Sequence, residues 1–124
     1  MNVEDTLKAM LEAGASAAKR RWKAMSEFAT AEFRALATAA ATLAENAVAD
    51  LAAAAALSTA KKRATATAKA KLRATLNLEN LQLATEGVLV AGKADVKLAA
   101  QDAINAAIGV LTTALNKSVG VDIF

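Results

Sequence analysis

The sequence predicts an all-α protein of two or three long alanine-rich helices, folded as an antiparallel hairpin or bundle that packs between subunits. Residues 28–57 carry this prediction most clearly, because alanine fills half of the positions and neither glycine nor proline occurs. The whole chain of 124 residues has no proline and only five glycines. Its apolar residues recur at steps of three and four, which is the period of an amphipathic helix.

The first predicted helix spans about residues 3–60. Asn2 is a suitable N-cap, and Glu4 and Asp5 place carboxylates in the first turn, where the helix dipole favours them. The apolar stripe that follows advances in steps of four and three, with a period near that of a straight helix. We interpret Gly14 as an ordinary thinning of this stripe, with a close approach of two helices as the alternative. The stripe consists of Leu7, Leu11, Gly14, Ala18, Trp22, Met25, Ala29, Phe33, Leu36, Ala40, Ala44, Ala47 and Leu51.

A break is expected between residues 58 and 68, before a second helix at about 66–86. The run Lys61, Lys62 and Arg63 suits a helix C-terminus, and the threonines after it are β-branched and form helix less readily. No residue there forces a stop, so a continuous helix is the alternative.

The last third of the chain is predicted to hold a turn or kink and one more helix, within a single domain that covers residues 1–124. Gly87 and Gly92 bracket a short apolar run, which predicts the turn or kink over 87–92. The third helix then covers about 93–118 and ends at Gly120. The apolar tail, residues 119–124, is expected to be disordered or docked into a groove of a neighbouring subunit.

Apolar residues on several sides of the helices predict contacts between subunits. Alanine buries only a methyl group, so a monomer gains little free energy from burial. The second helix has three leucines on one side and two on the other, as in a helix held between two neighbours. The first side consists of Leu72, Leu76 and Leu83, and the second of Leu78 and Leu81. The candidate subunit contacts are Leu36, Ala40, Leu43, Ala47, Leu51, Leu78, Leu81 and Phe124.

The composition argues against catalysis. Histidine, cysteine and tyrosine are all absent, which removes the usual general base, the thiol nucleophile and the ligands of most zinc sites. A carboxylate-bridged metal site in a bundle also needs histidine, and no glycine-rich phosphate motif occurs. We therefore predict no enzymatic activity, no catalytic residue, no metal site and no cofactor. Asp50 and Glu79 lie near apolar arcs and are candidates for buried partners of a basic residue.

Two basic clusters are candidate contacts for phosphate or another anion. Such clusters bind nucleic acid, an anionic membrane surface or an acidic protein, and solvated faces are the alternative. In composition, residues 60–71, AKKRATATAKAK, resemble the lysine–alanine tails of linker histones. The first cluster comprises Lys19, Arg20, Arg21 and Lys23, and the second Lys61, Lys62, Arg63, Lys69, Lys71 and Arg73.

No signal peptide or transmembrane segment is predicted. Residues 1–10 carry two acids and no apolar core, and the longest uncharged run, residues 103–116, is shorter than a bilayer span. We expect a cytoplasmic protein or a component of a virion-like assembly.

The predicted function is structural: a non-catalytic scaffold that self-assembles through alanine-rich helix faces into an oligomer, shell, tube or filament. The first alternative is an amphipathic coat on a lipid or polymer surface. An alanine-rich, cysteine-free chain of amphipathic helices resembles the phasins, which coat polyester storage granules, and this resemblance implies helices that lie on a hydrophobic surface. The second alternative is a nucleic-acid-associated helical protein that uses its basic clusters.

Overall fold

The computed structural model describes residues 1–92 and 97–124, and in these residues the protein is all-α, as predicted. The described helices are α1 (Val3–Ala18), α2 (Trp22–Ala55), α3 (Ala60–Gly92) and α4 (Lys97–Val119), and a 3-10 turn, η1 (Lys19–Arg21), joins α1 to α2. The packing between subunits stays a prediction.

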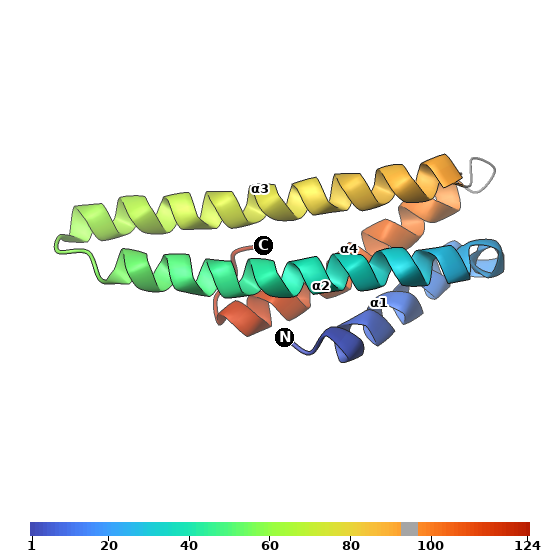
Figure 1. Cartoon of the computed structure of the whole chain (residues 1–124), viewed down its shortest axis with the longest axis horizontal. Helices are drawn as coiled ribbons and strands as arrows, with labels where there is room; N and C mark the ends of the chain where they lie inside the picture. Colours follow the sequence, from blue (N-terminus) through green and yellow to red (C-terminus); the bar gives the residue numbers. More distant parts are fainter. Residues whose placement is uncertain (93–96) are drawn as a thin grey trace.

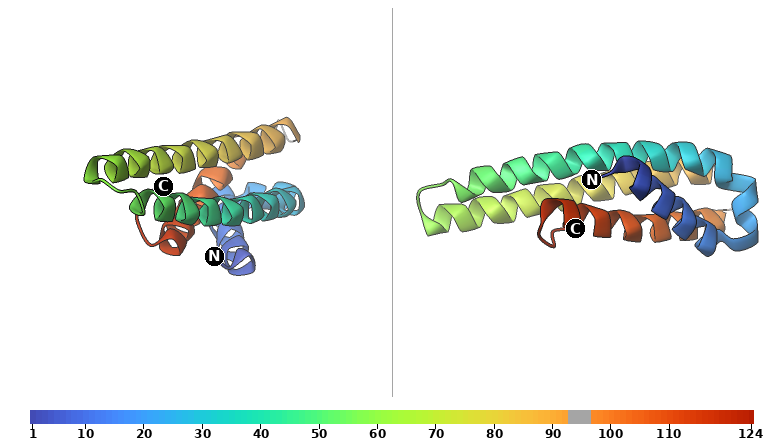
Figure 2. Two further views of the ribbon diagram at one scale, coloured as in Figure 1. Left: turned by 60° about the vertical axis from the view of Figure 1, so that its left-hand side comes forward. Right: turned by 90° about the horizontal axis from the view of Figure 1, so that it is seen from below.

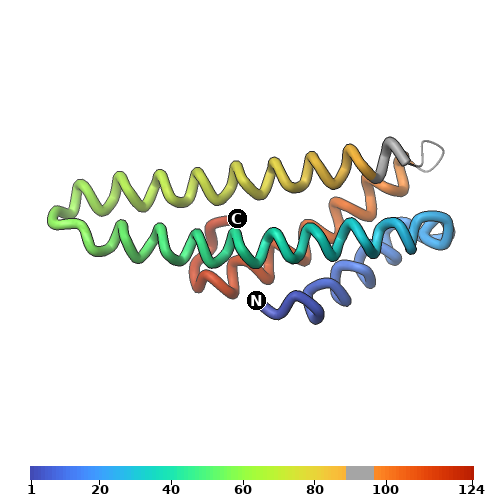
Figure 3. Tube along the Cα trace, viewed as in Figure 1, coloured from blue at the N-terminus to red at the C-terminus, as the bar shows by residue number. Residues whose placement is uncertain are grey.

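The helices form two layers (Figure 1). α2 and α3 make a long antiparallel hairpin that runs the whole length of the molecule, and α1 and α4 pack against each other on one side of it (Figure 2). These two helices cover only part of the hairpin. At the end where α2 turns into α3, the hairpin extends beyond them as a bare pair of helices (Figure 3).

The core lies where the helices of both layers meet. Its largest fully buried side chains are Phe33, Met10, Met25, Ile104, Leu111 and Leu115. The buried apolar residues outside this cluster are the alanines Ala47, Ala54, Ala70 and Ala74 of the hairpin. Because an alanine removes only a methyl group from water, burial stabilises the projecting end of the hairpin much less than the core.

The helix predicted over 3–60 is interrupted at η1 and ends at Ala55. Lys19 has a φ of 55°, and the chain reverses there, so that α1 returns alongside α2 and contacts α4. An ion pair between Glu4 and Arg34 joins α1 to α2. The apolar stripe itself is confirmed, because every one of its members is buried or half-buried on both sides of the break.

At Gly14 the surfaces of α1 and α2 approach closely, which corrects its interpretation as a simple thinning. A Cβ atom at this position would lie 3.1 Å from ring atoms of both Trp22 and Phe33. Those two rings pack against each other with centroids 6.3 Å apart. The missing side chain therefore makes room for the aromatic pair that closes this corner of the core.

The second break lies at residues 56–59, so the helix predicted at 66–86 begins earlier, at Ala60. The hydroxyl oxygen of Thr59 caps it by accepting a hydrogen bond from the backbone N–H of Lys62 at 3.2 Å. The basic run Lys61, Lys62 and Arg63 thus lies in the first turn of α3 and not at a helix C-terminus. Arg63 donates a 2.9 Å hydrogen bond back to the carbonyl oxygen of Leu57, in the turn between α2 and α3.

Of the turn or kink predicted over 87–92, the turn is wrong, because α3 continues to Gly92. The kink stays a prediction. A single glycine inside a helix costs only about 1 kcal/mol, which a helix of 33 residues can absorb. The start predicted for the third helix, residue 93, lies outside the described residues. The predicted end is confirmed: Gly120 follows α4 with a φ of 87°, and its N–H donates to the carbonyl of Asn116 at 2.9 Å.

The C-terminal tail is ordered and docks on its own chain, whereas its docking on a neighbouring subunit stays a prediction. The side-chain oxygen of Asn116 accepts hydrogen bonds of 2.9 Å from the backbone N–H groups of Ile123 and Phe124. Its amide nitrogen donates to the carbonyl of Phe124 at 3.3 Å. These bonds fold the tail back, so that Phe124 packs half-buried against the core.

Candidate interaction surface

The two basic clusters lie at opposite ends of the long hairpin (Figure 1). Residues 19–23 surround the corner between α1 and α2, whereas residues 61–73 follow the turn between α2 and α3. α2 separates them, and a helix of 34 residues is about 50 Å long at 1.5 Å per residue. The clusters therefore do not form one continuous anion-binding surface.

The second cluster is also divided within itself. All six of its basic side chains are exposed, but Arg63 is bonded to Leu57 in the turn before α3, and Arg73 forms an ion pair with Asp50 at 3.3 Å. Arg73 thus joins α3 to α2, and Arg63 joins α3 to the turn between them. Asp50 does pair with a base, but the pair is not buried as predicted, because the side chains of Arg73 and Asp50 are 67% and 35% exposed. Glu79 is exposed too.

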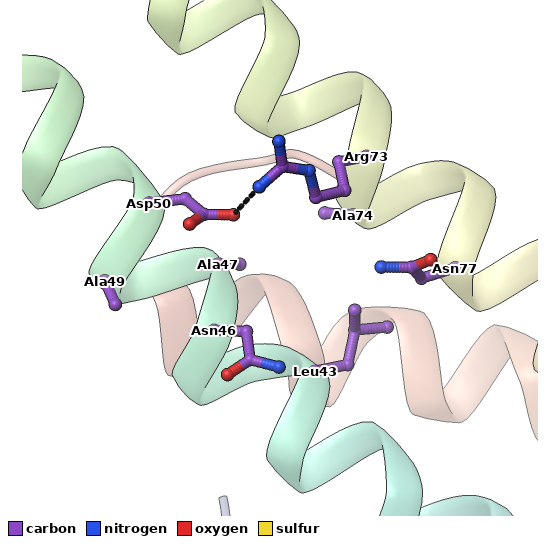
Figure 4. A pocket seen from close by; sticks show the side chains of 8 residues that line it. All are labelled: Leu43, Asn46, Ala47, Ala49, Asp50, Arg73, Ala74 and Asn77. Carbon is purple, nitrogen blue, oxygen red and sulfur yellow. Dashed lines mark hydrogen bonds and ion pairs between the residues drawn. The ribbon is translucent and has the colours of Figure 1, made fainter.

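The Asp50–Arg73 ion pair lies beside a pocket of about 190 Å³ between α2 and α3 (Figure 4). The two charged groups point toward each other across the gap between the helices, so each neutralises the other. Among the described residues, no buried polar side-chain atom lacks a hydrogen-bond partner. The pocket is lined by Leu43, Asn46, Ala47, Ala49, Asp50, Arg73, Ala74 and Asn77.

The residues predicted to contact other subunits are used inside the chain. Because α1 and α4 fold back onto the hairpin, its inner face is already covered. Five of these residues are buried: Leu36, Ala40, Leu43, Ala47 and Leu78. The other three are half-buried: Leu51, Leu81 and Phe124. The five buried residues are therefore not available to another copy in this fold.

The outer face of α3 presents such a surface. Leu72, Leu76 and Leu83 are 60%, 47% and 66% exposed, whereas Leu78 and Leu81 on the opposite side face the core. The two apolar sides seen in the sequence are therefore both present, but the chain itself covers only one. We name Leu72, Leu76 and Leu83 the outer leucine row.

A shallow apolar depression lies where α3 begins. Its volume is about 470 Å³, and it is lined by Leu57, Lys61, Lys62, Thr65, Ala66 and Lys69. The stems of long lysine side chains cover apolar surface while their charged ends remain in water. The depression thus combines an apolar floor with a positively charged rim.

Two remaining features of the described residues bear on metals and membranes. In residues 1–92 and 97–124, no group of three or more metal-binding side chains comes together. α4 is long and apolar enough to cross a membrane by length and composition alone. A core helix of a soluble protein passes the same test, and six residues of α4 are buried in the bundle.

The fold and the outer leucine row define an all-α bundle with one uncovered apolar helix face. No protein-family model matches the chain, and comparisons with curated proteins and with solved structures give no match.

Proposed function

We propose that this protein is a non-catalytic structural protein that self-associates through the outer leucine row of α3. The observation that carries the proposal is the exposure of Leu72, Leu76 and Leu83 on one face of one helix. Removing apolar surface from water yields about 25 cal/mol per Å², so covering a largely exposed leucine contributes about 1 kcal/mol or more. Three such residues on one helix face therefore supply part of the free energy of association.

The row differs from the other exposed apolar residues of the chain. Phe28 and Val48 on α2 are also exposed, but their separation of about 20 residues, at 3.6 residues per turn, places them on different sides of that helix. Single exposed apolar residues are normal, whereas a contiguous group marks an interaction surface. The outer leucine row is such a group.

Sedimentation velocity over a range of protein concentrations tests the proposal. We expect the average mass to rise with concentration for the natural chain. The double substitution Leu72→Glu and Leu76→Glu should abolish the rise and leave the helicity unchanged, since neither side chain is in the core. Val48→Glu on α2 is the matched control and should associate normally. A natural chain that is monomeric at every concentration up to the millimolar range contradicts the proposal.

A second candidate function is a coat on an anionic lipid surface. The depression of Leu57 with its rim of Lys61, Lys62 and Lys69 favours it, because amphipathic helices with basic rims bind such surfaces. Co-sedimentation with phosphatidylserine vesicles tests it, with phosphatidylcholine vesicles as the control. Binding to the anionic vesicles alone, lost in Lys61→Gln and Lys69→Gln, supports the coat. If the pellet contains as much protein without vesicles as with them, the coat is excluded.

A further inference from the structure

We infer that the self-association pairs α3 with α3 of a second copy in antiparallel orientation, about a two-fold axis between Leu72 and Leu76. This inference rests on the proposed function and adds the geometry of the contact. It follows from the charges that share a face with the outer leucine row.

The leucines belong to a longer row with the spacing of a coiled coil. Starting from residue 62, steps of three and four residues pass along one face of α3 to residue 86. Of the eight side chains, seven are exposed and that of Glu86 is half-buried. A repeat of seven residues in steps of three and four is the signature of two helices that pack along a shared seam. The seam consists of Lys62, Thr65, Lys69, Leu72, Leu76, Glu79, Leu83 and Glu86.

The charges on this seam are separated along the helix. Its first half carries Lys62 and Lys69, and its second half carries Glu79 and Glu86. The same polarity holds for α3 as a whole, because every ionisable residue from 60 to 78 is basic. A second copy laid head to tail therefore brings the basic half of each helix against the acidic half of the other.

The antiparallel register makes every layer of the seam complementary. When Leu72 of one copy faces Leu76 of the other, Lys69 faces Glu79 in the next layer. Leu83 then falls opposite Thr65, and Lys62 opposite Glu86. The two-fold axis repeats each layer, so the contact contains four pairs of opposite charge around a centre of leucines.

A parallel pairing gives the opposite result. Each residue of the seam then faces its own copy, so that Lys62, Lys69, Glu79 and Glu86 make four layers of like charge. Like charges in contact across an interface are strongly unfavourable. The same charges argue against an anionic membrane as the occupant of this seam, because it would repel Glu79 and Glu86.

The size of the seam sets the expected strength. Residues 62–86 span about 36 Å of helix at 1.5 Å per residue, and one helix face covers less than the ~800 Å² per partner of a standard interface. Charged residues at seam positions also lower stability while fixing the register. We therefore expect a dimer with a dissociation constant in the micromolar range or above.

Charge reversal tests the pairing. Lys69→Glu alone and Glu79→Lys alone each create two like-charge contacts in the antiparallel dimer, and each should weaken association about tenfold or more. The double variant restores opposite charges in both layers and should associate as the natural chain does. In a parallel dimer neither single substitution adds repulsion, so unchanged single variants overturn the inference.

Cross-linking tests the register directly, because the chain contains no cysteine and a single introduced thiol is unambiguous. With a short thiol-reactive cross-linker, a mixture of Lys69→Cys and Glu79→Cys chains should form a covalent heterodimer. Lys69→Cys alone should not, because its two copies lie about 15 Å apart along the seam at 1.5 Å per residue. Circular dichroism confirms that each variant keeps its helicity.

The outcomes separate this inference from the proposed function. If the natural chain does not associate at any concentration, both the proposed function and the antiparallel seam are wrong. A chain that associates but cross-links through Lys69→Cys alone, or gives no mixed product, overturns the antiparallel seam and leaves self-association in place.

Discussion

At Gly14 a missing side chain fixes how closely α1 approaches α2. The rings of Trp22 and Phe33 fill the space where a Cβ atom would lie. Gly14→Leu should therefore lower the free energy of unfolding by about 1–3 kcal/mol, because a side chain forced into a packed core displaces its neighbours. Urea denaturation followed by circular dichroism measures the change.

The control for Gly14 is Gly109, in the middle of α4. Nothing lies within 4 Å of a Cβ built there, and the residue is exposed. Gly109→Ala should raise the free energy of unfolding by about 0.5–1 kcal/mol, because alanine loses less conformational freedom in a helix. If the Gly14→Leu chain had the same free energy of unfolding as the natural chain, the close approach of α1 and α2 at Gly14 would be contradicted.

The reversal between α1 and α2 strains the backbone at Lys19. Its φ of 55° and ψ of −129° are rare for a residue with a side chain, and such conformations cost about 1–3 kcal/mol. Lys19→Gly should relieve this strain and raise the thermal midpoint. Lys71→Gly, in the interior of α3, should lower it, because glycine destabilises a helix interior. The opposite signs of the two changes in a thermal melt check the turn.

At the scale of the elements, the sequence predicted buried faces better than helix ends. The stripe from Leu7 to Leu51 follows from periodicity, and periodicity continues across η1 because both helices bury the same face. The break itself has no local signal, since Ala18 and Lys19 form helix readily. It arises because folding α1 back buries Leu7 and Met10 among α2 and α4, which is a tertiary gain.

The start of α3 carries its charges in an unfavourable place. Lys61 and Lys62 lie in the first turn, at the positive end of the helix dipole. Lys61→Glu should raise the free energy of unfolding by about 0.3–1 kcal/mol, measured in urea at a concentration where the chain is monomeric. Lys117→Glu in the last turn of α4 is the mirrored control and should lower it by a similar amount. Added salt should reduce both changes in the free energy of unfolding. If the two substitutions changed it in the same direction, the assignment of the helix ends would be contradicted.

At the scale of the whole molecule, the sequence predicted which leucines share a side of α3, but not which side the chain itself covers. It separated Leu72, Leu76 and Leu83 from Leu78 and Leu81, because helical periodicity shows which residues share a side. It could not tell which side another part of the same chain covers. That depends on the direction in which α1 and α4 pack, which for α1 is set by the reversal at Lys19.

The division of the molecule into a packed half and a bare hairpin half predicts two levels of local stability. Residues 48–55 of α2 and 60–70 of α3 bury only alanines, whereas residues 25–44 bury Met25, Phe33 and Leu36 among four helices. Segments with few buried contacts open with lower free energy. Amide hydrogen exchange in dilute solution should therefore be faster in the hairpin end than in residues 25–44.

Raising the protein concentration extends this experiment to the assembly. Association through the seam covers residues 62–86 and holds the bare end of α3 against a second copy. Exchange should then slow in that segment and stay unchanged in α1, which lies outside the contact. The Leu72→Glu and Leu76→Glu variant should show no dependence on concentration. Uniform slowing along the whole chain would instead indicate that association stabilises the fold globally, and slowing centred on α1 would place the contact on the other layer.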